Sequence, residues 1–125
     1  MEAKRFELSD YDEIKAWYEA RHLAVPKPDT FPGYGLIVKN VAAGFVILTD
    51  AKLGILEFYI SNPWSSEKRR DDALDEITKG LMQYGRQFGC KHFMCTTQLP
   101  AIGQRAMKHG LEFQGQFYLY FLKGE

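Results

Sequence analysis

Two thiols and an imidazole lie close together in the chain, at Cys90, His92 and Cys95. Thiolate and imidazole groups are ligands that zinc prefers in proteins. The surrounding residues predict a strand, on which Cys90 and His92 share one face while Cys95 points to the other. This arrangement disfavours a metal site, and a nucleophilic thiol would need a basic neighbour to lower its pKa. We therefore expect no metal here, and buried free cysteines instead.

The segment that contains these residues is predicted to be a β-α-β crossover unit. A strand over Leu53 to Ile60 is followed by a helix over Glu67 to Phe88 and a second strand over Lys91 to Thr97. Apolar residues at three- and four-residue steps indicate the helix, and Gly89 ends it. Such a unit keeps its strands parallel and puts the helix N-terminus at the carboxyl end of the first strand, where ligands bind.

The remaining segments predict a mixed sheet flanked by helices. Ser9 and Asp12 have the spacing of a capping box at the start of a helix that continues to Arg21. Prolines between His22 and Tyr34 predict an irregular loop, and short turns between the next three strands predict an antiparallel meander. The order is βαβββαβαββ, an α/β (α+β) fold in one domain, residues 1–125. The other predicted elements are strands over Ala3 to Leu8, Gly35 to Lys39, Gly44 to Thr49, Leu111 to Phe113 and Phe117 to Leu122, and a helix over Pro100 to His109.

Composition and charge narrow the choice of partners. The chain has 46% hydrophobic and 26% charged residues, which is ordinary for a globular protein, and its 16 basic and 16 acidic residues cancel. Without net charge there is no long-range attraction for polyanions, so we expect neither nucleic acid nor an anionic membrane as the main partner. We also expect a soluble, cytoplasmic protein, because we recognise no membrane-spanning apolar run and no secretory leader.

The order of elements, with a long helix bridging a parallel pair after an antiparallel meander, resembles the GNAT superfamily of N-acetyltransferases over nearly the whole chain. In that family the fourth strand ends in a hydrophobic-x-Pro stretch, and a glycine-rich loop then wraps the pyrophosphate of acetyl-CoA. Pro63 matches the strand end. The resemblance implies that the strands around Ile60 and Thr96 splay, so that the pantetheine arm enters between them beside Ile60 and Ser61. Four residues depart from the family's arginine and glycines: Ser66, Glu67, Arg69 and Asp71.

Two interpretations remain open for the start of the helix, Lys68 to Asp72. Glycines let a backbone approach phosphate oxygens, whereas bulkier side chains take up that room. The side chains of Arg69 and Arg70 would bind the phosphates instead, because a guanidinium fork suits phosphate geometry, and Ser65 and Ser66 would add hydroxyl donors. The alternative is a solvated helix start with local ion pairs.

Glu57 lies six residues before Pro63, where many members of the family carry a glutamate on the cleft side of the fourth strand. An amine substrate is an ammonium ion near neutral pH and attacks a thioester only after it loses a proton. The resemblance therefore implies that Glu57 accepts this proton, directly or through a water. The alternative is a charged residue on the exposed face of a strand, between Leu56 and Phe58, which would both face the core.

The residues after the fifth strand match the family only in part. The family tends to show Asn-x-x-Ala there, and a tyrosine eight residues beyond the Asn. This chain has Gln98 at the first position and Ala106 at the last. The resemblance implies that Gln98 donates to a cofactor carbonyl. Ala106 cannot protonate a departing thiolate, which leaves water or another tyrosine, such as Tyr118 or Tyr120, for that step.

Two functions are compatible with these residues. The first is an acyl-CoA-dependent N-acyltransferase that uses acetyl-CoA and an unidentified amine, by direct attack without a covalent enzyme intermediate. The second is a catalytically inactive binding module of the same fold, since function belongs to sites rather than to folds. Tyr118 and Tyr120, in the aromatic final strand, would then contact a protein partner or a second copy of the chain in a homodimer.

Overall fold

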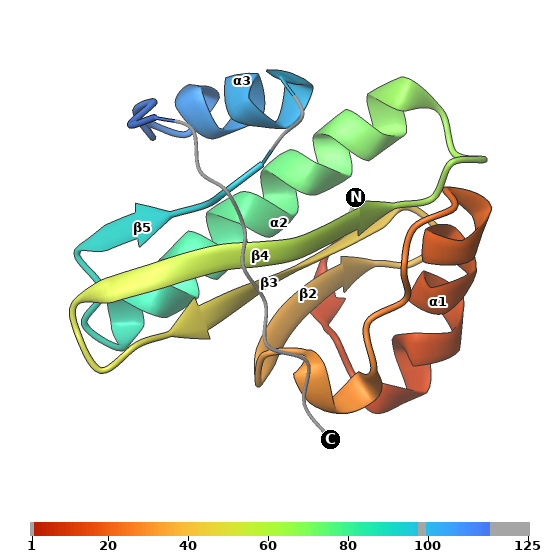
Figure 1. Ribbon diagram of the computed structural model, residues 1–125, viewed down its shortest axis with the longest axis horizontal. Helices are drawn as coiled ribbons and strands as arrows, with labels where there is room; N and C mark the ends of the chain where they lie inside the picture. The colour runs from red at the N-terminus through yellow and green to blue at the C-terminus, as the bar shows by residue number, and fades with distance from the viewer. Residues whose placement is uncertain (1, 98–99, 116–125) are drawn as a thin grey trace.

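A five-stranded sheet forms the centre of the computed structural model, which describes residues 2–97 and 100–115 (Figure 1). The strands lie side by side in the order β1-β2-β3-β4-β5. Neighbours are antiparallel from β1 to β4, and β5 is parallel to β4. The sheet is therefore mixed, which confirms the predicted fold class. The strands are β1 Lys4–Arg5, β2 Tyr34–Val38, β3 Ala42–Leu48, β4 Leu53–Ser61 and β5 His92–Met94.

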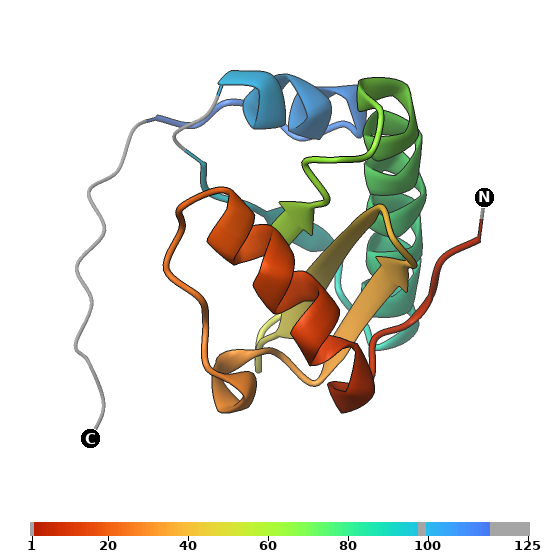
Figure 2. The same cartoon turned by 90° about the vertical axis from the view of Figure 1, so that its right-hand side faces the viewer.

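Helices cover both faces of this sheet (Figure 2). One core lies between α1 and the sheet and includes Ile14, Trp17 and Phe45. A second core lies between α2 and the opposite face, around Ile77 and Leu81. The helices are α1 Tyr11–Ala20, α2 Glu67–Gln87 and α3 Pro100–Lys108, with 3-10 turns at Leu8–Asp10 and Pro28–Thr30.

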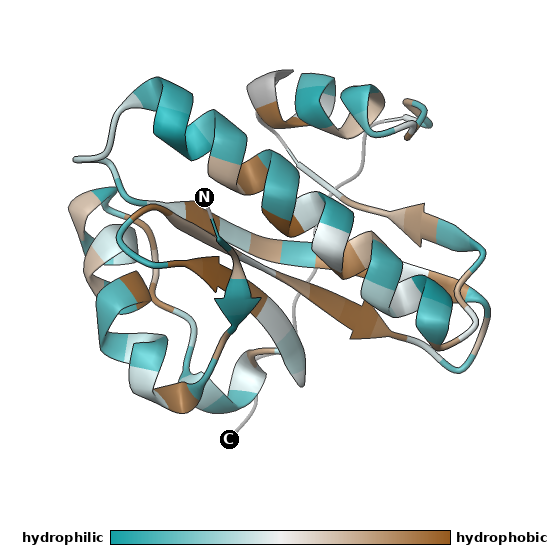
Figure 3. Ribbon diagram, turned by 180° about the vertical axis from the view of Figure 1, so that it is seen from behind, coloured by the Kyte–Doolittle hydropathy of each residue, from teal (hydrophilic) through white to brown (hydrophobic). Residues whose placement is uncertain are grey.

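α2 forms because its apolar side chains repeat at helical spacing and its first turn is capped. Ser66 is the cap, since its Oγ accepts a hydrogen bond from the Arg69 N–H at 3.3 Å. Ile77 and Leu81, two members of the predicted apolar stripe, are completely buried. The outward face of α2 is largely hydrophilic (Figure 3). No helix in the described part of the chain, α2 included, is both long enough and apolar enough to cross a bilayer.

The N-terminal helix begins differently from the prediction. The expected capping box of Ser9 and Asp12 is wrong, because Ser9 lies within the first 3-10 turn. Asp10 fills this role instead, and its Oδ2 accepts a backbone N–H from the start of that turn at 2.9 Å. Lys4 and Lys39 bind the same carboxylate at 3.0 and 3.1 Å. Lys4 of β1 and Lys39 of the β2–β3 turn thus select Asp10.

The shorter strands also differ from the prediction. β1 has two residues and β5 has three, where the sequence predicted strands over Ala3 to Leu8 and Lys91 to Thr97. The predicted strand over Leu111 to Phe113 is wrong, because these residues form no strand. Leu111 packs against the α2-side core instead. The predicted strand over Phe117 to Leu122 lies outside the described residues.

β4 contains a β-bulge, which is an extra residue opposite β3. Phe45 pairs with Glu57 and Ala43 pairs with Ile60, so that two residues of β4 lie opposite one residue of β3. Phe58, the first of the two, has a left-handed backbone with φ of 59°. This conformation costs a residue other than glycine about 1 to 2 kcal/mol. Its ring packs against the aromatic cluster on the α1 side of the sheet, which offsets that cost.

The bulge changes which face of the sheet each side chain reaches. Leu56 and Phe58 both contact the core, but Leu56 packs on the α2 side and Phe58 on the α1 side. Tyr59 also packs on the α2 side, and its hydroxyl lies 2.9 Å from Thr78 Oγ1. The Tyr59 ring lies over Gly44, where an added Cβ atom would come within 2.2 Å of it. The bulge therefore requires glycine at this position of β3.

Substituting Gly44 by Ala should lower the free energy of unfolding by about 1 to 3 kcal/mol, the usual cost of overpacking a core. The added methyl group would overlap the Tyr59 ring, which its hydrogen bond to Thr78 holds in place. Gly33→Ala is the matched control, because no atom lies within 4 Å of the position of its Cβ. Urea unfolding measures both variants, and equal stabilities would show that the ring moves aside freely.

α3 is attached to α2 by charged side chains around Asp75. This carboxylate accepts hydrogen bonds from Arg105 Nη1 at 3.1 Å and Lys108 Nζ at 2.6 Å, and lies 3.1 Å from His109 Nε2. Arg105 also donates to Asp71 Oδ1 at 2.6 Å. Burial raises the pKa of Asp75, but the hydrogen bonds from Lys108, His109 and Arg105 outweigh it and lower the pKa to about 2. The ionised carboxylate therefore stabilises the attachment of α3.

Asp75→Asn should lower the free energy of unfolding at pH 7 by about 1 to 3 kcal/mol, because charge-assisted hydrogen bonds are lost. The folded pKa of about 2 lies below the ordinary 3.8, so Asp75 stabilises the fold above about pH 4 and this contribution is lost as the pH falls toward 2. The variant should lack this part of the pH dependence. Asp72→Asn is the control, since Asp72 makes an exposed ion pair with Lys68. Urea unfolding at pH 7 and pH 3 tests the difference, and equal losses in both variants would contradict a special role for Asp75.

Candidate functional site

The two parallel strands pair over a short stretch and then separate. The paired residues run from Leu53 with His92 to Ile55 with Met94. β5 ends at Met94, whereas β4 continues to Ser61. The bulge lies in this unpaired part of β4, and a bulge bends a strand and increases its twist. The two segments are therefore unpaired from Leu56 onward, although the Thr96 side chain still reaches Glu57.

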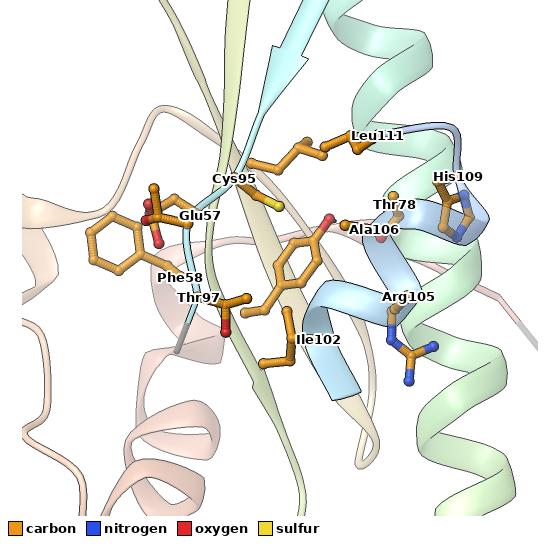
Figure 4. Close-up of a pocket in the computed structure, with 13 residues that line it drawn as sticks. Glu57, Phe58, Thr78, Cys95, Thr97, Ile102, Arg105, Ala106, His109 and Leu111 are labelled. Atoms are coloured by element: carbon orange, nitrogen blue, oxygen red, sulfur yellow. Dashed lines mark hydrogen bonds between the residues drawn. The ribbon is translucent and has the colours of Figure 1, made fainter. Parts of the chain in front are cut away.

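A cavity of about 140 Å³ lies in the gap between the separated strands (Figure 4). Residues of β4, of the segment 95–97, of α2 and of α3 line it. Figure 4 shows Glu57 and Phe58 on one side of β4, and Thr78, Ala106 and His109 on the other side. The cavity thus has one wall with a carboxylate and a second wall beneath α3.

Glu57 is the carboxylate on the first wall. It is half-buried in β4, and this burial raises its pKa above the ordinary value. Hydrogen bonds from the Phe58 N–H and the Thr96 hydroxyl lower the pKa in part. A carboxylate with a raised pKa accepts a proton more readily than an exposed one. Thr96 holds Glu57 across the gap, and sequence reasoning gave Thr96 no such role.

Tyr18 lies next to Glu57 on the α1 side. Its hydroxyl donates to the Phe58 carbonyl oxygen at 3.5 Å. Burial and the negative charge of Glu57 raise the pKa of Tyr18 to about 12, so the phenol stays neutral near pH 7. The sequence predicts Tyr18 as a core residue, and it is buried in the α1-side core. Tyr18 and Phe58 are 40 residues apart in the chain, so no local sequence pattern could predict that Tyr18 lies at the site.

The second wall is lined by apolar groups and by polar groups that already have partners. Tyr59 is hydrogen-bonded to Thr78, and burial raises the pKa of its phenol. Arg105 and His109 are bound to Asp75. The lining also includes the aliphatic or thiol side chains of Leu56, Cys95, Ile102, Ala106 and Leu111, and the exposed side chain of Thr97. This wall is suited to an apolar group.

The thiols in this region are not arranged for nucleophilic or metal chemistry. Burial raises the pKa of Cys95, as does the negative charge of Glu57, so Cys95 remains a thiol at neutral pH. Cys90 is buried, and His92 is exposed. In residues 2–97 and 100–115, no three His, Cys, Asp or Glu side chains gather closely enough to hold a metal ion.

The residues predicted to bind phosphate separate into two places. Arg70 folds back over the junction between β4 and α2, where its guanidinium donates to the carbonyl oxygens of Ser65 and Pro63. The Ser65 Oγ is buried there without a hydrogen-bond partner in the described structure. Ser66 caps α2. Arg69 lies elsewhere, beside β2 and the N-terminus in a second hollow that includes Lys39.

At the end of β4, Ile60 is buried in the α1-side core, and Ser61 is held by Arg21 of the α1 C-terminus. Arg21 donates to the Ser61 carbonyl oxygen at 2.9 Å and to its Oγ at 2.8 Å. Burial lowers the pKa of Arg21, and the positive charge of nearby Arg70 lowers it further. Two guanidinium groups therefore meet beside the N-terminus of α2. Sequence reasoning missed Arg21, and Gln98 lies outside the described residues.

Comparison with solved structures finds the same fold in several proteins. An acetyltransferase of Trypanosoma brucei superposes with a TM-score of 0.70 at 12% identity, over 97% of this chain and 99% of that one. AAC(6')-Iy in complex with the bisubstrate analog CoA-S-monomethyl-acetylneamine gives 0.69 at 10% identity, over 98% of both chains. Glucosamine-6-phosphate N-acetyltransferase from Arabidopsis thaliana gives 0.69 at 12% identity, over 96% and 97%.

Sequence comparison gives no further assignment. No family model matches the chain, and no curated protein sequence matches it. At these identities the structural likeness concerns the arrangement of helices and strands. The sequence-based expectation of the fold is confirmed: this chain has the fold of the GNAT superfamily of N-acetyltransferases.

Proposed function

We propose that the protein is an acyl-CoA-dependent N-acyltransferase that transfers the acetyl group of acetyl-CoA directly to an amine, in the cytoplasm. The observation that carries this proposal is the position of Glu57 at a cavity in the gap between β4 and β5. The reaction requires a proton acceptor beside a space that admits the thioester, and Glu57 is a half-buried carboxylate at such a space. The fold supports the proposal, because one protein of this fold was solved with a CoA-containing bisubstrate analog.

The described residues fit a CoA thioester at both of its ends. The gap beyond Ile55 and Met94 leaves room for a narrow arm, and the cavity lies along it. At the phosphate end, Arg21 and Arg70 would bind the phosphate oxygens, since guanidinium groups bind phosphate strongly. The partnerless buried Oγ of Ser65 would be satisfied by a further ligand oxygen. Side chains would thus bind the phosphates that the glycine-rich loop binds in the family that the chain resembles.

The reaction follows from these positions. Glu57 takes a proton from the ammonium group of the substrate. The amine nitrogen then bonds to the thioester carbonyl carbon, while the carbon–sulfur bond breaks and the sulfur leaves with the electron pair. The nitrogen loses its second proton to water as the amide forms, and this proton balances the one that the sulfur takes up. Water protonates the sulfur, because Ala106 has no proton to give. Tyr18 and Thr96 hold the strand and the carboxylate in place during these steps.

Acetyl-CoA at about one hundred times its Kd should raise the free energy of unfolding by about 2.7 kcal/mol. Arg70→Ala should weaken the affinity about 10- to 100-fold, because a charge-assisted hydrogen bond is lost. Arg69→Ala is the matched control, since Arg69 lies in the second hollow. Thermal unfolding and titration calorimetry measure both effects. Absence of binding to the unsubstituted protein would exclude the proposed function.

Glu57→Gln should keep its affinity for acetyl-CoA and lose about 100- to 10,000-fold in turnover, the usual contribution of a general base. Turnover of the unsubstituted enzyme should rise with pH through the raised pKa of Glu57, since only the ionised carboxylate accepts a proton. This acidic limb should disappear in the variant. Release of free CoA thiol with a panel of amines gives the rates.

Glu19→Gln is the control for this experiment, because Glu19 is an exposed residue of α1. Its turnover and pH profile should match those of the unsubstituted enzyme. If Glu57→Gln retains full activity, Glu57 has no part in the chemistry even if acetyl-CoA binds.

A further inference from the structure

The carboxylate of Glu57 has no cationic partner among residues 2–97 and 100–115. The salt bridges between described residues join other acidic side chains, namely Asp10, Glu13, Asp71, Asp72 and Asp75. The hydrogen bonds to Glu57 come from neutral groups, the Phe58 N–H and the Thr96 hydroxyl. The neighbouring phenol of Tyr18 is neutral near pH 7 as well. The charge of this half-buried carboxylate is therefore not balanced by the described residues.

The basic side chains of the site are bound to other groups. Arg105 and His109 line the cavity but lie on the other side of β4 from Glu57 (Figure 4). Both are bound to Asp75, at 3.1 Å. Arg21 donates two hydrogen bonds to the end of β4, at 2.9 and 2.8 Å. Each of these cations thus has a partner other than Glu57.

The surface beside Glu57 is aromatic instead. Glu57 and Phe58 lie together on one side of β4 (Figure 4). Phe58 packs against Phe31, with the ring centroids 5.4 Å apart. Aromatic rings attract ammonium groups and pack against alkyl and aryl groups. A ligand that reaches Glu57 thus meets one negative charge and aromatic surface.

A negative charge without a partner discriminates between amines. It attracts an ammonium group and repels a carboxylate in the same ligand. In an α-amino acid both groups are attached to one carbon atom, so an amine within reach of Glu57 brings its acid group close as well. Two like charges about 6 Å apart weaken binding about 3- to 100-fold, at effective dielectric constants of about 80 to 20.

We propose that the acceptor is an alkylamine or arylalkylamine with no carboxylate beside its nitrogen, and that the charge of Glu57 excludes α-amino acids. This inference rests on the proposed function, because it names the class of amine that the same site accepts. Glu57 then has two roles, since it repels acidic acceptors and takes the proton from the amines that bind.

Pairs of molecules that differ by one carboxylate test the proposal: phenethylamine with phenylalanine, and histamine with histidine. Each amine should exceed its amino acid about 3- to 100-fold in kcat/KM, measured by release of CoA thiol from acetyl-CoA, and in affinity for the CoA-loaded protein, measured by calorimetry. Phenylalanine amide has nearly the size of phenylalanine but no negative charge, so it should behave like phenethylamine. Equal values for an amine and its amino acid, or a preference for the amino acid, would overturn the inference.

Substitutions at Thr96 and Glu57 test whether charge is the cause. Thr96→Lys should bring phenylalanine close to phenethylamine in affinity, because the added ammonium group would lie beside Glu57 and offset its charge. Thr96→Met is the matched control of similar length without charge, and it should keep the preference. Glu57→Gln should remove the preference in binding to the CoA-loaded protein, whether or not turnover survives. An unchanged preference in the folded Thr96→Lys and Glu57→Gln variants would overturn the inference.

Binding of CoA separates this inference from the proposed function. If CoA and acetyl-CoA bind but no amine binds to the CoA-loaded protein at millimolar concentration, the inference is overturned while the cofactor site stands. If neither CoA nor acetyl-CoA binds, the proposed function itself is overturned.

Discussion

The extra residue in β4 is the constraint on which the site depends. Phe58 takes a left-handed conformation, and this single insertion bends the strand where it loses its pairing with β5. Glu57 reaches the α1 side by alternation with Leu56, and the bulge keeps Phe58 on that side and turns Tyr59 to the α2 side. The aromatic cluster around Phe58 and the glycine beneath Tyr59 hold the bulge on its two faces. The core of the protein thereby maintains an opening in its own sheet.

Local patterns predicted the parts of the fold that local interactions decide. α2 agrees closely, because its apolar stripe and its cap both lie within the helix. The meander agrees because short turns force antiparallel pairing. The predictions failed where residues distant in the chain determine the local structure. Lysines from β1 and from the β2–β3 turn bind Asp10, so Asp10 forms the capping box that was predicted for Ser9 and Asp12. Likewise, Leu111 to Phe113 form no strand, because Leu111 packs directly against the α2-side core.

The candidate site was predicted less completely than the fold. Glu57 could be named because it lies six residues before Pro63, where the family that the chain resembles carries a glutamate, and Arg70 because it follows the strand end together with Arg69. The sequence analysis gave Arg69 the same role as Arg70. The helix turns successive side chains about 100° apart, so the two arginines point to different places. Tyr18, Arg21 and Thr96 reach the site from other segments of the chain. A bulge with phenylalanine in place of glycine also leaves no mark in the sequence.

The ion pairs that attach α3 determine how firmly this helix covers the cavity. None of the α3 side chains that the structure describes belongs to either hydrophobic core, so this helix is held chiefly through Asp71 and Asp75. The groups that hold α3 are themselves largely buried, because the side chains of Arg105 and Asp75 are each 17% exposed and that of His109 is 9% exposed. Salt screens partly buried ion pairs much less than exposed ones. The cover over the cavity should therefore hold at ionic strengths that weaken the exposed pair of Lys68 and Asp72, whereas protonation of Asp75 would loosen it.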